Sequence, residues 1–135
     1  MRILSITAQK PHSTGSGVYL TGLVKGFAAL GHEQAVVAGV YEEDEMHFPE
    51  GTRVYPVYYK TESLPFPIAG MSDEMPYTST RYRDMTEEMA GQFKAAFLEV
   101  LDEAIEKAAK AVDIMISQGV DAAMNEYNRK VPAQK

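Results

Sequence analysis

The residues best suited to chemistry near the start of the chain form the run His12-Ser13-Thr14-Gly15-Ser16-Gly17. Hydroxyl side chains can hydrogen-bond sugar or phosphate oxygens, and glycines let backbone N–H groups approach an anion closely. A helix that begins just after the run would present its positive N-terminal end there. The run therefore predicts a phosphate or phosphosugar site contacted by Ser13, Thr14, Gly15, Ser16 and Gly17. The alternative is a tight turn that needs two glycines.

The run does not match the phosphate motifs of common nucleotide-binding proteins. Leu20 stands where the third glycine of a dinucleotide fingerprint would fall, and no Walker motif is present. The Ser-Thr-Gly-Ser segment is similar to a flavodoxin phosphate loop, but it lies farther beyond the first strand. Flavin binding is therefore kept only as a minor alternative, and no cofactor is expected.

Two further side chains in loops could take part in chemistry. His12 could act as a general acid or base, since an unperturbed imidazole titrates near neutral pH; a solvated loop histidine is the simpler alternative. Arg81 is the best candidate for a side-chain anion partner in a long loop over residues 60–86. No two histidines have the spacing of metal ligands on a helix, so no metal site is expected.

The surrounding sequence alternates between strand and helix signals. Short apolar or β-branched runs predict strands over residues 3–8, 35–40, 52–59 and 113–117. Apolar residues at helical spacing predict helices over residues 18–30, from residue 85 for about 25 residues, and over residues 119–130. Strand, helix and strand in succession indicate a parallel sheet. Such a sheet places the His12–Gly17 run at the carboxyl end of its first strand, where ligands bind in open α/β folds.

Composition narrows the class of protein. The 135 residues suit one domain, with 45% hydrophobic and 24% charged residues and no cysteine. A net charge of −6 argues against a nucleic-acid partner. No apolar run reaches the roughly 18 residues of a membrane span, so we expect no integral membrane segment and a cytoplasmic location.

The sequence resembles the N-terminal domain of a family-4 glycosyltransferase of the two-domain GT-B fold. The first 40 residues carry the resemblance through the opening strand, the Gly-rich loop, the amphipathic helix and the turn Leu30-Gly31-His32-Glu33. The stretch FPIAGMSDEMPYTSTRYRDMT, residues 66–86, resembles a bacterial subgroup of these enzymes. Together the similarity covers about residues 1–107.

The resemblance implies that residues 1–135 form a single, incomplete acceptor-side domain of a nucleotide-sugar-dependent glycosyltransferase of hexosyltransferase type. The donor nucleotide sugar is bound in such enzymes chiefly by a second, C-terminal domain. The isolated chain is therefore expected to be inactive. Relatives often place a catalytic histidine just after the fourth strand, where this sequence has Gln118. His12 and Gln118 are expected to border the acceptor cleft.

The fold expected from these observations is a Rossmann-like three-layer α/β domain with a parallel sheet of strand order 3-2-1-4. The edge of the fourth strand would lack a neighbour, and unpaired edges favour association. We therefore expect a homodimer, or a partner chain that supplies the missing domain. A non-enzymatic scaffold or assembly domain is the alternative function.

Overall fold

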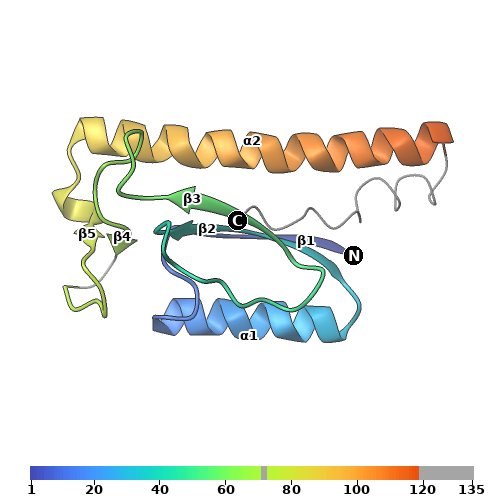
Figure 1. Cartoon of the computed structure of the whole chain (residues 1–135), viewed down its shortest axis with the longest axis horizontal. Coiled ribbons are helices and arrows are strands. Elements are labelled where there is room, and N and C mark those ends of the chain that lie inside the picture. Colours follow the sequence, from blue (N-terminus) through green and yellow to red (C-terminus); the bar gives the residue numbers. More distant parts are fainter. Residues whose placement is uncertain (71–72, 119–135) are drawn as a thin grey trace. The chain divides into compact units, whose positions relative to one another are not determined.

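The computed structural model describes residues 1–70 and 73–118, with the side chains of residues 108–117 left out. Contacts divide the chain into two compact units, Met1–Leu101 and Asp102–Lys135. The elements run in the order β1 (Arg2–Thr7), α1 (Gly15–Ala29), β2 (Glu33–Val40), β3 (Arg53–Tyr58), β4 (Ala69–Gly70), β5 (Thr80–Arg81), a 3₁₀ turn η1 (Tyr82–Asp84) and α2 (Glu87–Gln118) (Figure 1). The prediction of one domain over residues 1–135 stays a prediction.

The main sheet contains three parallel strands in the order β1-β2-β3. Thr7 pairs with Ala38, and Ala38 pairs with Pro56 on the other side. Pro56 has no N–H to donate, and it lies in β3 at an edge of this sheet, where that loss is tolerated. The predicted Rossmann-like α/β fold with a parallel sheet is confirmed at this level, as is the order of its first three strands.

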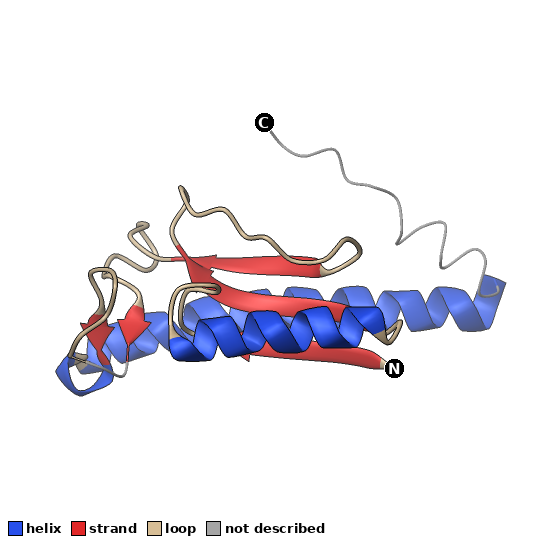
Figure 2. Cartoon of the chain, turned by 90° about the horizontal axis from the view of Figure 1, so that it is seen from below, coloured by secondary structure: helices blue, strands red, loops and turns tan. Residues whose placement is uncertain are grey.

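The core lies on both faces of β2, because parallel strands between helices are buried on both sides. Val24 of α1 packs with Val36, Ala38 and Val40 on one face. On the other face Val37 is fully buried and Val57 is 2% exposed. Figure 1 shows α1 on one side of the sheet and the first part of α2, up to Leu101, on the other; Figure 2 shows α1 running along the three strands.

Helix α1 starts three residues earlier than the predicted residue 18, so Gly15, Ser16 and Gly17 form its first turn. The reason is Thr14, whose extended backbone and side-chain oxygen cap the helix. At the other end Gly31, with φ of 76°, donates its N–H to Ala28 O, and His32 donates to Phe27 O. These two bonds form a Schellman motif, which glycine favours.

The predicted fourth strand is wrong. Residues 113–117 belong to α2, which continues from Glu87 to Gln118 without a break. A short apolar run alone does not distinguish a strand from a helix. No glycine or proline separates this run from the Ala- and Lys-rich segment before it, so the helix continues through it. The strand order 3-2-1-4 is therefore not confirmed.

The predicted long loop over residues 60–86 contains the small parallel pair β4–β5 and the turn η1. The predicted helix over residues 119–130 lies outside the described residues. In the part of the chain that the structure describes, no helix combines the length and apolar character that crossing a membrane requires.

Candidate functional site

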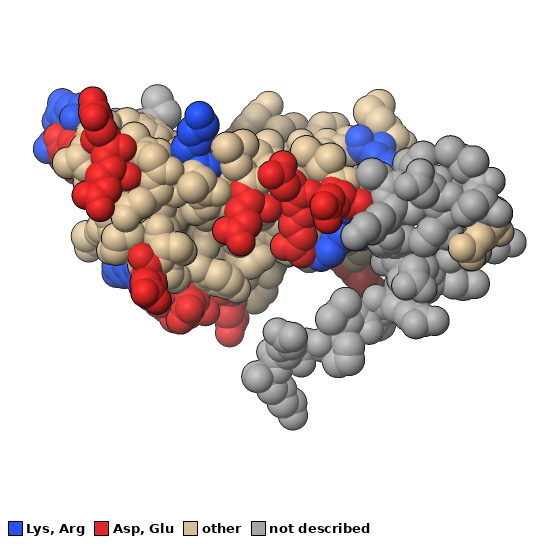
Figure 3. Space-filling view, turned by 90° about the horizontal axis from the view of Figure 1, so that it is seen from above, with Lys and Arg blue, Asp and Glu red and all other residues tan. Residues whose placement is uncertain are grey.

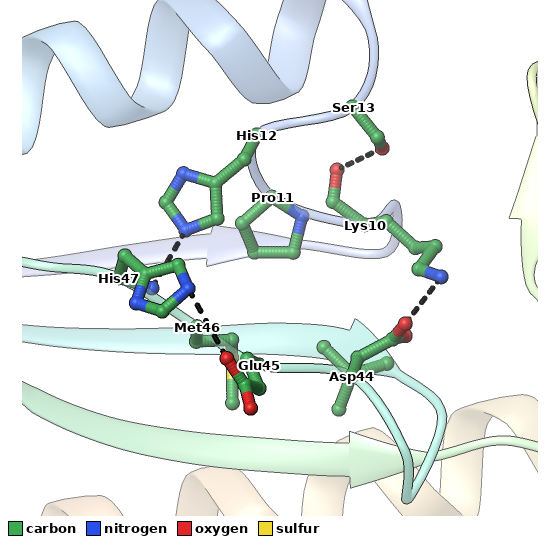
Figure 4. A pocket seen from close by; sticks show the side chains of 9 residues that line it. Lys10, Pro11, His12, Ser13, Asp44, Glu45, Met46 and His47 are labelled. Atoms are coloured by element: carbon green, nitrogen blue, oxygen red, sulfur yellow. Dashed lines mark hydrogen bonds and ion pairs between the residues drawn. The ribbon is translucent and has the colours of Figure 1, made fainter.

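The candidate site lies at the carboxyl end of the sheet, where the loop after β1 faces the loop after β2. A cavity of about 160 Å³ separates the two loops. It is lined by Lys10, Pro11, His12 and Ser13 on one side and by Val40 and residues 44–47 on the other (Figure 4). Sites for drug-sized ligands occupy about 300–1,000 Å³. The cavity therefore has room for a small group such as a phosphate or part of a sugar ring.

The start of α1 offers backbone donors beside these loops. Thr14 Oγ1 accepts the Gly17 N–H at 3.2 Å, and Thr14 O accepts the Val18 N–H at 2.7 Å. The N–H groups of Gly15 and Ser16 come before these and have no intrahelical acceptor, as at any helix start. Of the two predicted glycine contacts, only Gly15 keeps its N–H for a ligand, because that of Gly17 is used by the cap.

The two glycines of the predicted site also differ in packing. A Cβ at Gly17 would lie 2.5 Å from Lys10 O and 3.1 Å from His12 N, so the loop after β1 requires glycine there. A Cβ at Gly15 would meet nothing within 4 Å. Packing among the described residues therefore explains Gly17 but not Gly15, whereas close approach of a ligand would explain Gly15.

Gln9, which was not predicted from the sequence, accepts hydrogen bonds from two of the three predicted hydroxyl contacts. Gln9 Oε1 accepts from Ser16 Oγ at 2.8 Å and from Thr14 Oγ1 at 3.3 Å. The third hydroxyl, Ser13 Oγ, donates to Lys10 O at 3.0 Å. The only signal in the sequence was that Gln9 lies two residues beyond β1, at the carboxyl end of the sheet.

His12 connects the loop after β1 to the loop after β2 through its ring Nε2, and to helix α1 through Nδ1. Its Nε2 accepts the His47 N–H at 3.1 Å, so Nδ1 carries the proton and donates to Thr21 Oγ1 at 2.7 Å. Thr21 Oγ1 in turn donates to Gly17 O at 2.8 Å. His12 holds φ of 67°, a left-handed conformation that is uncommon outside glycine. The arrangement makes His12 a latch between the loops; its predicted catalytic role stays a prediction.

Acidification should open this latch. Burial lowers the pKa of His12, and the nearby His47 and Lys25 lower it further. The unfolded chain then binds a proton at His12 more readily than the folded chain, so stability falls as the pH drops below about 6.5 and levels off below the folded-state pKa. Urea unfolding between about pH 5 and pH 8 measures this slope.

The matched variants for that measurement are His12→Gln and His32→Gln. His12→Gln should flatten the slope, because it removes the titrating group, and His32→Gln should preserve it. A slope that survives His12→Gln would show that another group controls the acid sensitivity. A protonated Nε2 would face the His47 N–H donor to donor, which is why the latch cannot persist in the charged form.

Lys10 and Asp44 form an ion pair across the same cavity. Both side chains are largely shielded from solvent, at 19% and 18% exposure, so the pair is better protected from screening than a surface pair. Asp44 Oδ2 also accepts the Tyr41 N–H at 2.8 Å. Asp44 belongs to the acidic run at residues 42–45, and its carboxylate thus has both a lysine and a backbone N–H as partners.

Arg81 and Gln118 have different surroundings from those expected. Arg81 donates to Asp73 at 2.9 Å and to Asp84, and these carboxylates raise the pKa of its guanidinium. Its donors are thus shared with protein carboxylates rather than directed to an anion. Gln118 is the exposed last residue of α2 and belongs to the second unit. The site described here consists of residues from the first unit.

Figure 3 shows acidic side chains on the face that carries α2. The exposed acidic residues of this helix include Glu99, Asp102, Glu103 and Glu106. Within the described ranges, no group of three His, Asp or Glu side chains is placed to hold a metal ion. No protein-family model and no curated protein matches the chain.

Proposed function

We propose that the chain is the acceptor-binding N-terminal portion of a nucleotide-sugar-dependent glycosyltransferase, inactive without a C-terminal donor domain. The observation that supports this most directly is Gly15. It stands at the first turn of α1, at the carboxyl end of a parallel sheet, with no acceptor for its N–H among the described residues and open space where a side chain would be. Close approach of a sugar or phosphate would account for a glycine there.

The chemistry of such an enzyme is positioning and electrostatic stabilisation of the leaving diphosphate. In this chain the N–H groups of Gly15 and Ser16 would donate to sugar or phosphate oxygens, and the cavity beside His12 and Ser13 would take part of the acceptor. Donor binding and the completion of the reaction would fall to a second domain, either in a partner chain or in a longer chain.

A scaffold or assembly domain is the second candidate. It is favoured by β1, which is an edge strand among the described strands and leaves Leu4 42% and Ile6 53% exposed. An apolar edge strand is a template for pairing with a further strand. A homodimer, or a partner chain that adds a strand at β1, would cover these side chains.

The deciding experiment is calorimetric titration of the full chain with UDP, GDP, nucleotide sugars and a panel of acceptor sugars, comparing wild type with Gly15→Val. The substitution should leave unfolding unchanged, because the side chain enters open space, and should weaken binding at least about tenfold, or 1.4 kcal/mol. Binding that is equal in both proteins would place the ligand elsewhere. No binding, together with a dimer in sedimentation, would favour the assembly domain.

A further inference from the structure

Three loops at the carboxyl end of the sheet place charged groups around one aromatic ring. Lys10 follows β1, Tyr41 directly follows β2, and Lys60 follows β3. Lys10 Nζ lies 4.9 Å and Lys60 Nζ 4.3 Å from the centroid of the Tyr41 ring. The distance between the two ammonium groups is therefore at most the sum of these two distances.

The ring that gathers them is rigidly held. Tyr41 is 5% exposed. Its hydroxyl donates to Thr78 O at 2.9 Å and accepts the Ile68 N–H at 3.1 Å. Its ring cannot turn away without breaking these bonds, so the positions of the two lysines rest on a fixed platform. Interaction with the ring offsets part of their mutual repulsion.

The charges around the ring are not balanced. Asp44 pairs with Lys10, but among the described residues no carboxylate forms an ion pair with Lys60. The Tyr41 ring accepts no full hydrogen bond, so the donors on Lys60 Nζ remain available to a ligand. Two ammonium groups and one carboxylate leave a net positive charge that a bridging anion would neutralise.

The backbone of Lys60 also adopts a conformation that is unfavourable for a residue other than glycine. Its φ of 57° lies in the left-handed region, which is unfavourable for a non-glycine residue because the Cβ comes too close to the following carbonyl oxygen. Hydrogen bonds on either side impose this backbone: the Tyr59 N–H donates to Val40 O at 2.9 Å, and Thr61 Oγ1 donates to Tyr58 O at 3.2 Å. A use for the ammonium group would account for a lysine at a position where glycine would be less strained.

We infer that Lys60, together with Lys10, binds an oxyanion, a phosphate or carboxylate group carried by the acceptor. The pair adjoins the proposed acceptor site, because Lys10 lines the 160 Å³ cavity and its carbonyl holds Ser13. This inference rests on the proposed function and makes it more specific: the acceptor would be a phosphorylated or acidic sugar rather than a neutral one.

The test is a titration of the ¹⁵N-labelled full chain, monitored at the amides of Tyr41, Lys60 and Thr61. Inorganic phosphate and glucuronate are the probes, and sodium chloride keeps the ionic strength constant. We expect saturable shifts with phosphate, with glucuronate or with both; the pattern distinguishes a phosphate from a carboxylate. Shifts no larger than those with chloride alone would overturn the inference.

Variants at position 60 make the test specific. Lys60→Met should raise the Kd at least about tenfold, whereas Lys60→Arg should retain binding, because it keeps the charge. Lys60→Gly also removes the charge and adopts the left-handed backbone without strain, so it should fold and still lose binding. Lys94→Met, at an exposed lysine of α2, is the control and should bind like wild type. Unchanged binding in Lys60→Gly would refute the role of Lys60.

The outcomes of this experiment distinguish a failure of the oxyanion site from a failure of the proposed function. It requires neither a nucleotide sugar nor a donor domain, since inorganic phosphate and glucuronate are the probes. Phosphate binding without any sugar or nucleotide-sugar binding would keep the oxyanion site and remove the glycosyltransferase proposal. Binding of neutral sugars that depends on Gly15, without binding of phosphate or glucuronate, would keep the proposed function and remove the oxyanion site.

Discussion

Gly17→Ala should destabilise the protein by about 2 kcal/mol, the cost of forcing atoms into a closely packed place. The new Cβ would lie 2.5 Å from Lys10 O and 3.1 Å from His12 N. Both neighbours are backbone atoms of one loop, so neither can move aside by a simple rotation. The loop after β1 would have to shift, and with it the cap at Thr14 and the His12 latch. Urea unfolding at neutral pH measures the loss.

The control for this prediction lies in the same helix. A Cβ at Gly22 would meet nothing within 4 Å, so Gly22→Ala should be neutral or stabilise α1 by up to about 1 kcal/mol, the difference in helix propensity. If both variants lost the same free energy, alanine in α1 would be harmful for a reason other than the contact with Lys10. If Gly17→Ala matched wild type, the described path of the loop would be wrong.

The sequence was sufficient to predict the three parallel strands and α1. The runs at residues 3–8 and 35–40 are short and apolar, and Leu20, Leu23, Val24 and Phe27 repeat at helical spacing. Such patterns are local, and burial on both sides of a parallel sheet enforces them. The predicted position of the His12–Gly17 run at the carboxyl end of β1 is confirmed, whereas its role as a binding site stays a prediction.

The residues that hold this site together could not be predicted, because their partners are distant in sequence. The bond from the His47 N–H to His12 spans 35 residues, and the Tyr41 hydroxyl reaches Thr78 over 37. No periodicity or motif encodes such pairs. Lys10, Asp44 and Lys60 are also distant from one another in sequence, and the parallel pairing of β1, β2 and β3 brings the loops that carry them together.

The prediction of a fourth strand was wrong because the local sequence pattern was ambiguous. The run at residues 113–117 is apolar and short, which suits a buried strand or one turn of a helix equally. The resemblance to glycosyltransferases favoured a strand at this place. The structure instead continues α2 to Gln118, so the resemblance beyond about residue 107 carries no information about this segment.

Gly39→Ala should have the largest effect of the substitutions considered, a loss of about 3 kcal/mol, at the upper end for overpacking. Gly39 lies near the end of β2, between two rigid neighbours. A Cβ there would overlap the carbonyl oxygen of Ala8 and lie 2.8 Å from Cε2 of Tyr59. Tyr59 is 1% exposed, so its ring has no space into which it could withdraw.

A double variant tests how much of this loss is caused by the Tyr59 ring. Tyr59→Leu removes the ring contact but not the overlap with Ala8, so Gly39→Ala should cost less in the Tyr59→Leu background than in wild type, and still more than zero. Urea unfolding of the two single variants and the double variant gives this coupling free energy. Strict additivity would show that the ring is not what opposes a side chain at position 39. A coupling would show that the close packing at the end of β2 includes the Tyr59 ring.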